Sequence, residues 1–351
     1  MFPNDYAELK RRVTAAGLLD KRPGYYVATM SANLVLVGLL VAALVIFRSN
    51  LPILLAVAAG MGFMGAQLGF VGHDAGHRQM FAAPWKNVAA GLFWGNLVMG
   101  MSPSWWNDKH NAHHGNPNHT DMDPDIDTPI VAYSAEQARG KARWARWIVR
   151  RQAYLLFPLL SLLAWNMHLS SVEFLLRRRS KRTRPEVVAN RTKYRRIEIA
   201  LLLVHLPFYL GGLVLLLGWY AIPVILIHHA VWGIYIGCSF APNHKGMPML
   251  DDSSQLDFFR KQVLTARNVR PSVVRDYLYG GLNYQIEHHL FPACPHPHLP
   301  ALRRLVRQFC SDVGVPYHEV GVVDSYRELL GFLNAVGRSL DEPPAGVFAA
   351  A

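Results

Sequence analysis

Long apolar stretches almost free of charge dominate this sequence. One uninterrupted run, VLVGLLVAALVIF, covers Val35–Phe47 and extends back to Tyr26 through mainly small residues. Similar stretches are Leu51–Val71, Leu201–Leu217 and Ala221–Phe240. Each approaches the ~20 residues that a helix needs to cross the hydrocarbon core of a bilayer. Since 51% of the 351 residues are hydrophobic and only 17% are charged, part of the apolar surface is expected to face lipid. We therefore predict an all-α integral membrane protein.

The number of crossings depends on two further stretches. Val88–Met101 is too short to span a bilayer, and Trp147–Met167 is interrupted by Arg150 and Arg151. If the second stretch crossed, the basic block RRRSKRTR at Arg177–Arg184 would lie outside the cell, against the positive-inside rule. We therefore place both stretches in the membrane interface as interfacial or re-entrant helices. Four transmembrane helices remain, with both termini in the cytosol and a tight turn at residues 48–50.

Composition limits the partners and the compartment. The net charge of +12 is accompanied by no nucleic-acid motif, and the basic block Arg177–Arg184 lies beside apolar segments. We expect this block to attract anionic lipid headgroups, and we expect no nucleic acid as a partner. The start MFPNDYAELKRR does not resemble a cleaved signal peptide, and Cys238, Cys294 and Cys310 form no C-x-x-C pair. We therefore expect the part of the protein outside the membrane to face the reducing cytosol.

We divide the chain into three segments by these properties. Residues 1–24 form a cytosolic N-terminal segment, residues 25–300 a membrane domain, and residues 301–351 a cytosolic C-terminal segment. No internal repeat marks a further boundary.

The histidines are grouped at the predicted cytosolic ends of the spans. His73 and His77 are four residues apart, and His110, His113 and His114 follow a spacing of three and four, so each set shares one face of a helix. His244 follows the fourth predicted span. The last group is GLNYQIEHHLFP, in which Gln285 stands three residues before His288 and His289, at the place that His110 holds in HNAHH.

Imidazoles in such numbers indicate a metal site. No thiolate pair and no E-x-x-H pair accompanies them, and more ligands are present than one ion accepts, so two metals are predicted. Three points leave alternatives open. HDAGH resembles the H-E-x-x-H of zinc proteases with Asp74 in place of glutamate, although that site leaves the other groups unexplained. A metal transporter needs ligands inside the spans, where only His205, His228 and His229 lie. The acidic run DMDPDID after the second group is read as a loop.

The other histidines are expected to be structural or exposed to solvent, as lone histidines in apolar chains usually are. They are His119, His168, His205, His228, His229, His296, His298 and His318.

Three segments in order, HDAGH, KHNAHHGNPNHTDMDPDID and NYQIEHHLFP, resemble the histidine boxes of membrane fatty-acid desaturases. The QIEHH form is similar to that of front-end and related bacterial acyl desaturases. The resemblance implies a helical cytosolic cap holding a di-iron centre, use of O2, and removal of two hydrogens from a fatty-acyl chain carried on CoA or on a lipid. It assigns as ligands His73, His77, His110, His113, His114, His244, His288 and His289. A bacterial cell membrane is the implied location.

The resemblance also assigns roles around the ligands. Asp74, Asp108 and Glu287 are candidates to orient imidazoles, or else are solvated charges at helix ends. Gln285 is a candidate catalytic residue whose carbonyl oxygen accepts from metal-bound water or binds iron weakly, with a packing or capping role as the alternative. Because the sequence contains no HPGG haem motif, a separate electron donor such as a ferredoxin, cytochrome or reductase is expected.

Two alternatives to a desaturase remain at this point. A di-iron membrane hydroxylase or ketolase would hold its metals with histidines in the same three-box arrangement. The alternative that is not an enzyme is a histidine-rich metal-binding or transport protein. Aromatic residues near the second box either line a substrate channel or form an interfacial belt, and we favour the belt for most of them. They are Phe93, Trp94, Trp105 and Trp106.

Overall fold

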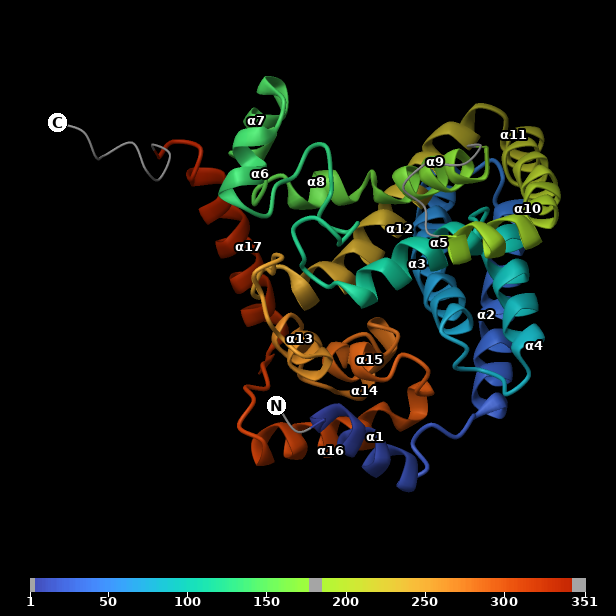
Figure 1. Ribbon diagram of the computed structural model, residues 1–351. Coiled ribbons are helices and arrows are strands. Elements are labelled where there is room, and N and C mark those ends of the chain that lie inside the picture. The colour runs from blue at the N-terminus through green and yellow to red at the C-terminus, as the bar shows by residue number, and fades with distance from the viewer. Residues whose placement is uncertain (1–3, 177–184, 343–351) are drawn as a thin grey trace.

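A computed structural model describes residues 4–176 and 185–342, and side chains are not described for residues 185–192. The fold is built almost entirely of helices, as predicted (Figure 1). The basic block Arg177–Arg184 lies outside the described residues, so its proposed attraction to headgroups stays a prediction.

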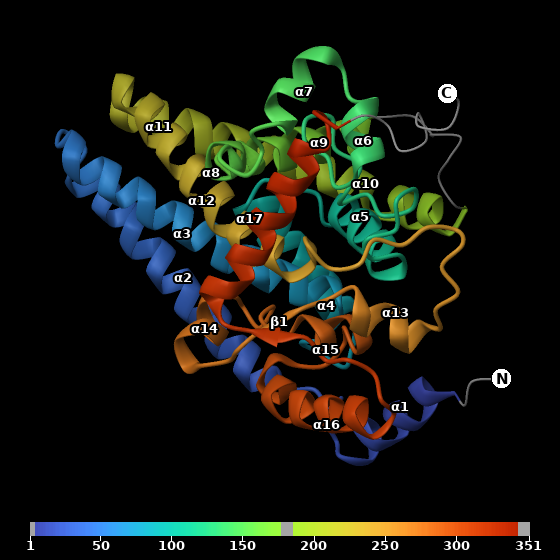
Figure 2. The same ribbon diagram turned by 90° about the vertical axis from the view of Figure 1, so that its left-hand side faces the viewer.

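The first two apolar stretches form a helical hairpin. Helix α2 is Pro23–Ile46 and helix α3 is Leu51–Gly76, and the turn between them lies where it was predicted. Asn50 caps α3, because its side chain accepts a hydrogen bond from the Ile53 amide, and Pro52 occupies the first turn, where no amide donor is needed. Figure 2 shows α2, α3 and α12 (Ala221–His244) as one slanted layer.

A second hairpin contains the two later apolar stretches. Its elements are α10 (Pro185–Leu206), the π-helix η2 (Pro207–Gly211), α11 (Gly212–Leu217), the 3-10 turn η3 (Gly218–Tyr220) and α12. The chain reverses at Gly218, whose φ of +54° falls in the left-handed region that glycine adopts readily. Leu213 therefore packs in one cluster with Val224, and the Tyr209 hydroxyl contacts Nδ1 of His228.

Among the described residues, four helical segments are long and apolar enough to cross a membrane. They are Pro23–Ile46, Leu51–Gly76, Leu156–Leu176 and Lys193–His244. The last segment contains both later predicted spans, because the chain reverses direction at Gly218 within it. A straight helix of 52 residues would be far longer than a bilayer is thick. The third differs from our prediction, which places Trp147–Met167 in the interface.

The third candidate segment, Leu156–Leu176, overlaps only the later part of the predicted interfacial stretch Trp147–Met167. Helix α7 (Arg143–Val149) ends before the two arginines, and α8 (Leu156–Leu160) and α9 (Leu163–Leu176) begin after them. In Figure 1, α8 and α9 run across the picture, whereas α2 and α3 run down it. The apolar length that qualifies this segment therefore comes from α8 and α9 together, both of which lie beyond the two arginines.

Short helices connect these layers near the histidines. They are α4 (Pro84–Gly91), the π-helix η1 (Leu92–Val98), α5 (Pro103–Gly115) and α6 (Ala135–Gly140). Ser102 caps α5 by accepting from the Trp105 amide, and Pro103 starts its first turn. This cap fixes where α5 begins and hence which of its faces carries the second histidine group.

A helical cap closes one end of the long apolar helices. We define the cap as α1 (Asp5–Ala15), α13 (Phe258–Leu264), α15 (Gln285–Leu290) and α16 (Leu299–Asp312), which share one apolar core. The N-terminal helix α1 lies against α16, as Figure 1 shows, and Leu9 and Val13 are completely buried there. The cap thus holds α15, with its two histidines, against the ends of the long apolar helices.

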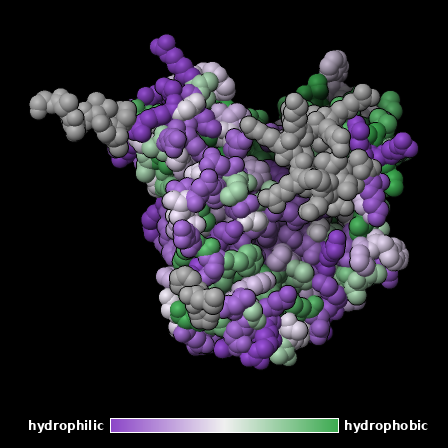
Figure 3. Space-filling model, viewed as in Figure 1, coloured by the Kyte–Doolittle hydropathy of each residue, from purple (hydrophilic) through white to green (hydrophobic). Residues whose placement is uncertain are grey.

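The remaining elements join the cap to the other helices. They are β1 (Asn268–Val269), α14 (Val273–Leu278), the 3-10 turn η4 (His296–His298), β2 (Glu319–Val320) and α17 (Val322–Arg338). Strands β1 and β2 pair in parallel. In Figure 3, hydrophilic residues prevail on the lower left of the face shown, and hydrophobic residues gather at its upper right edge, over α10 and α11.

Candidate metal centre

Four helices bring the predicted site residues together. The last turn of α3 and the residue after it supply His73 and His77, and the last turn of α12 supplies His244. Helix α5 supplies His110, His113 and His114, and α15 supplies Gln285, His288 and His289. Because the spacings of three and four residues place each set on one helical face, every set points to the same centre.

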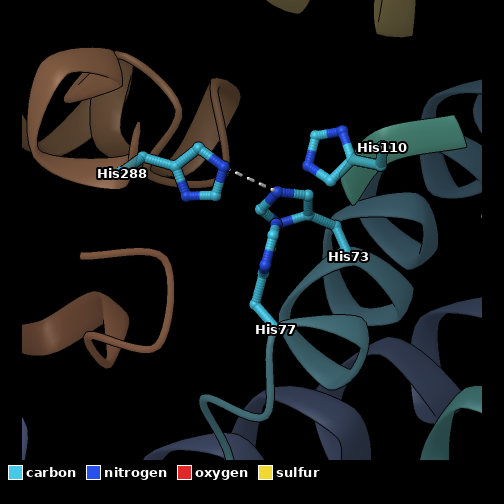
Figure 4. Close-up of side chains that lie close together, drawn as sticks. All are labelled: His73, His77, His110 and His288. Atoms are coloured by element: carbon cyan, nitrogen blue, oxygen red, sulfur yellow. Dashed lines mark hydrogen bonds between the residues drawn. The ribbon is translucent and has the colours of Figure 1, made fainter. Parts of the chain in front are cut away.

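One group joins all three histidine segments. The ligand atoms of His73, His77, His110 and His288 lie within 4.8 Å of one another. Nε2 of His73 is 3.1 Å from Nε2 of His288, and Figure 4 shows these rings facing each other across the gap between α3 and α15. His114 adjoins this group, since its Nε2 is 3.1 Å from Nε2 of His110.

A second group lies beside the first. The ligand atoms of His113, His244 and His289 also lie within 4.8 Å of one another, and all three residues are buried. Nε2 of His113 is 3.3 Å from Nε2 of His244, and the Gln285 amide nitrogen is 2.8 Å from the same His244 atom. The ring of His114 stacks on that of His289 with centroids 4.2 Å apart, so the two groups are adjacent.

Hydrogen bonds to the opposite ring nitrogens decide the tautomer of four imidazoles. Nδ1 of His73 is 3.0 Å from the Asp74 carboxylate, and Nδ1 of His113 is 3.0 Å from both Asp123 oxygens. Nδ1 of His244 is 2.9 Å from the Thr265 carbonyl oxygen, and Nδ1 of His289 is 2.9 Å from Oε1 of Gln262. Each partner only accepts, so Nδ1 carries the proton and Nε2 carries a lone pair.

These lone pairs converge, which fits a bound cation. Nε2 of His113 and Nε2 of His244 are both fixed as acceptors, yet they lie 3.3 Å apart. Two facing lone pairs repel each other, whereas a metal ion between such atoms is held by both. Buried Nε2 atoms of His77 and His289 have no hydrogen-bond partner among the described residues. The donor set therefore fits metal binding at both groups.

Burial keeps the imidazoles in the form that binds metal. Loss of water, reinforced by neighbouring imidazoles, holds the pKa of the ligand candidates outside the spans well below the ordinary histidine value. They are His77, His110, His114, His288 and His289. Neutral imidazoles are the metal-binding form, so the site is prepared to take a cation at neutral pH.

The acidic residues near the boxes have different roles. Asp74 contacts His73 as expected. The expectation for Glu287 is wrong, because its oxygens accept from the Asn268 amide at 2.7 Å and the Tyr317 hydroxyl at 2.9 Å rather than from an imidazole. Burial raises the pKa of Glu287 to about 7. Asp108 lines a cavity beside the site.

Three residues that hold imidazoles were not foreseen from the sequence. Asp123 is 2% exposed and lies in the acidic run DMDPDID, whose position directly after the second box was the available signal. The partners of His289 and His244, which are Gln262 and the Thr265 carbonyl, come from α13 and the residue that caps its end. No local pattern in FFRKQVLT distinguishes them, because they reach the site only through folding of the cap.

The amide of Gln285 is reversed relative to our hypothesis. Nδ2 of Asn243 faces the carbonyl oxygens of Ser239 at 2.9 Å and Leu282 at 3.0 Å, which fixes it as the donor end. That nitrogen also donates to Oε1 of Gln285 at 3.0 Å. The Gln285 oxygen therefore faces away from the imidazoles, and its NH2 group faces His244. In this orientation Gln285 presents a donor to the second group.

The other histidines make structural contacts. Nδ1 of His205 is 3.0 Å from the Leu97 carbonyl oxygen, and Nδ1 of His229 is 2.9 Å from that of Ile225. His318 pairs with Glu328 at 3.0 Å, and His119 is buried. Within the part of the chain that the structure describes, none of these residues belongs to a group close enough to hold a metal. The structural interpretation of these residues agrees with these contacts.

A cavity of about 1040 Å³ passes His73. Along α3 its lining runs from Gly69 past His73 to Gly76 and, just beyond the helix, Arg78. Trp106 also lines it and stacks on His110 with centroids 4.9 Å apart. At roughly 30 Å³ for a group the size of a water molecule, the cavity exceeds the volume of one long alkyl chain. An alkyl chain lying in it would pass directly beside the first histidine group.

The predicted aromatic belt is wrong for three of its four residues. Trp94 and Trp105 are buried in a core cluster, and Trp106 lines the cavity, whereas Phe93 is 41% exposed. The sequence shows that α5 and η1 are short, but it does not show which of their faces pack against the neighbouring helices. The tertiary contacts decide that point.

Comparison with known proteins gives a consistent family. The model of the family described as "Fatty acid desaturase" matches residues 48–321. The chain is 31% identical to the "Delta(8)-fatty-acid desaturase" of Euglena gracilis over 97% of this chain and 81% of that protein. It is 30% identical to the "Delta(5) fatty acid desaturase fat-4" of Caenorhabditis elegans over 92% of this chain and 70% of that protein. It is 28% identical to the "Acyl-lipid (9-3)-desaturase" of Physcomitrium patens over 97% of this chain, which spans 64% of that relative.

Proposed function

We propose that this chain, which belongs to the fatty acid desaturase family, removes two hydrogens from a fatty-acyl chain in an O2-dependent reaction. One observation carries the proposal: two groups of buried, converging imidazoles lie beside a cavity large enough for an acyl chain. In the overall reaction the acyl CH2–CH2 unit, O2, two electrons and two protons give CH=CH and two molecules of water.

Two iron ions are the proposed cofactors. The first would be held by His73, His77, His110 and His288 with the adjoining His114. The second would be held by His113, His244 and His289, with the Gln285 NH2 group beside it. When bound, iron supplies the oxidising power that an unactivated carbon–hydrogen bond requires, because such a bond has no acidic proton for a base to remove.

The chain's own side chains orient and protect this centre. Asp74 and Asp123 fix the tautomers of His73 and His113, which keeps each Nε2 directed at its ion. The NH2 group of Gln285, fixed through Asn243, would donate to an oxygen atom near the second ion. Burial of the imidazoles excludes water, so an acyl chain in the cavity would be held beside His73 in an apolar environment.

The order of the lining residues along α3 supports one orientation of the acyl chain. Arg78 lines the cavity just beyond the helix end, whereas Gly69 lines it nine residues earlier, with Met99 beside Gly69. The polar head of an acyl-CoA or acyl-lipid would lie at the Arg78 end, and the methyl end would extend toward Gly69.

We further propose that the protein lies in a membrane with the cap on the cytosolic side. The candidate spans support insertion, and the histidine groups all lie at one end of α3 and α12. The four-crossing topology, with α8 and α9 in the interface, is part of this proposal. A ferredoxin, cytochrome or reductase would supply the two electrons.

Lipid analysis of a host with and without the chain tests the proposal. We expect new double bonds with the parent and none with His113→Ala, together with a lower iron content in the purified variant. His318→Ala is the matched control, because His318 is 40% exposed and belongs to neither histidine group.

Three outcomes would overturn the proposal. Hydroxylated or keto lipids without new double bonds would indicate a hydroxylase or ketolase. An active protein with one zinc and no iron would contradict the cofactor. Metal uptake that needs neither O2 nor an electron donor would indicate a transporter.

A further inference from the structure

A second, smaller cavity adjoins the Gly69 end of the first. Its volume is about 80 Å³, and it lies among α2, α3, α9, α10 and α12. Four histidines outside the metal centre line it, and we define it as the histidine annex. They are His168, His205, His228 and His229.

Two side chains separate the annex from the large cavity. Met99 and Trp232 line both spaces, and they are 7% and 2% exposed. Along α3 the large cavity reaches Gly69, whereas the annex is lined by Gly65, one helical turn farther from His73. The Met99 and Trp232 side chains therefore form a wall at the Gly69 end of the large cavity, away from the end that Arg78 lines.

The two parts of the wall differ in rigidity. The Trp232 indole is packed so closely on Gly65 that a Cβ at this glycine would lie 2.9 Å from the ring. The terminal methyl group of Met99 is 3.7 Å from the corresponding position at Gly69, which is an ordinary contact. Because methionine is unbranched and has three rotatable bonds, Met99 is the part of the wall that can be changed with least disturbance.

The annex can receive an apolar group although histidines line it. His205, His229 and His168 each place Nδ1 within 3.0 Å of a backbone carbonyl oxygen, namely those of Leu97, Ile225 and Ala164. His229 stacks on Trp165 with centroids 4.0 Å apart. Nε2 of His168 lies 2.9 Å from the Met99 carbonyl oxygen, and Nδ1 of His228 contacts the Tyr209 hydroxyl. At least one ring nitrogen of each histidine is therefore already hydrogen-bonded, and the ring faces can meet an incoming chain.

We propose that the Met99–Trp232 wall sets the length of the acyl tail that the enzyme accepts, and that the histidine annex takes the tail's last carbons when the wall is opened. This inference rests on the proposed function, because it places the methyl end of the substrate against the wall. At roughly 30 Å³ for each methylene-sized group, the annex adds room for about two or three carbons.

Met99→Ala opens the wall at its flexible part. Burial of a methylene group contributes ≈ 0.8 kcal/mol, which corresponds to about fourfold in relative kcat/KM for each added carbon. A substrate two carbons longer than the parent's preferred chain should therefore gain about 15-fold relative to that chain. Gly69→Ala narrows the large cavity instead, and its new methyl group meets Ile236 and Met99 at 3.5 and 3.7 Å without a clash, so it should favour shorter chains.

The experiment gives the parent and each variant an equimolar mixture of acyl substrates that differ in length, and measures the double-bonded products. Gly38→Ala is the control, because a Cβ at this α2 glycine meets nothing within 4 Å among the described residues. Iron content and yield in the membrane fraction check the folding of each variant.

The outcomes separate this inference from the proposed function. If the parent forms no double bonds, the proposed function fails. If the parent desaturates, opposite shifts by Met99→Ala and Gly69→Ala support the wall, with Gly38→Ala unchanged. If Met99→Ala is misfolded, Gly69→Ala alone decides by its shift to shorter chains. Unchanged length preference in the folded variants overturns the inference.

Discussion

Replacing Asp123 with asparagine should loosen the second metal while leaving the shape of the site intact. The carboxylate receives three donors: Nδ1 of His113 at 3.0 Å, the Asn118 amide at 2.8 Å and the Asp125 amide at 2.9 Å. An asparagine amide offers one oxygen and one NH2 group. Whichever way it turns, the NH2 group meets at least one backbone donor.

Two effects follow from this geometry. Leaving a buried donor unsatisfied costs ≈ 1–3 kcal/mol of folding stability. Loss of the charged partner of His113 also lowers the basicity of its imidazole, and loss of such an outer partner typically costs ≈ 10–100-fold in metal affinity or activity. That range corresponds to ≈ 1.4–2.8 kcal/mol of binding free energy.

The assay measures iron affinity of the purified protein by competition with a chelator, with thermal unfolding in parallel. Asp252→Asn is the matched control, because Asp252 is paired with His119 at 3.4 Å but its side chain is 89% exposed. If folded Asp123→Asn keeps the parent's content and affinity for iron within twofold, Asp123 does not hold His113 for the metal and the reasoning is refuted.

Three further predictions concern the site and the topology. Gln285→Ala should stay folded but desaturate at least tenfold more slowly, and Gln285→His should keep more activity than Gln285→Ala, as measured by product formation. Parent rates with unchanged iron in Gln285→Ala would contradict this role. Removing the metals with a chelator should lower the unfolding temperature, because an ion that binds only the folded chain stabilises it; an unchanged melting curve would contradict metal binding at these groups. Cysteines placed at Ser49 and at Trp219, beside Gly218, should react with an impermeant label outside intact cells, whereas cysteines near Lys181 or Pro295 should not; labelling at Lys181 would contradict the four-crossing topology.

Most of the features that the sequence predicted depend on the spacing of residues that are close together in the chain. The separation of His110, His113 and His114 decides that they share a helical face, whatever the rest of the chain does. The apolar lengths of α2 and α3 similarly follow from the chain itself. These features depend on residues close together in sequence, so pattern and periodicity were sufficient.

Features that depend on distant segments were beyond such reasoning. The orientation of the Gln285 amide is fixed by Asn243, which is in turn held by the Leu282 carbonyl. Gln262 reaches His289 only because α13 and α15 share the core of the cap. Trp106 faces the cavity because of how α5 packs, and not because of any signal in its own neighbours. Each of these depends on an arrangement that exists only after the helices have met.

The contact between His73 and His288 joins positions 215 residues apart. The entropy of closing a long loop must be overcome before such a contact can contribute, and a chain that emerges from the ribosome presents His73 long before His288. A nascent chain that ends before α15 carries only part of each histidine group, so it lacks the full set of proposed ligands for either ion. In the proposed di-iron enzyme, metal binding would therefore follow synthesis of nearly the whole chain and would stabilise the completed fold rather than start its folding.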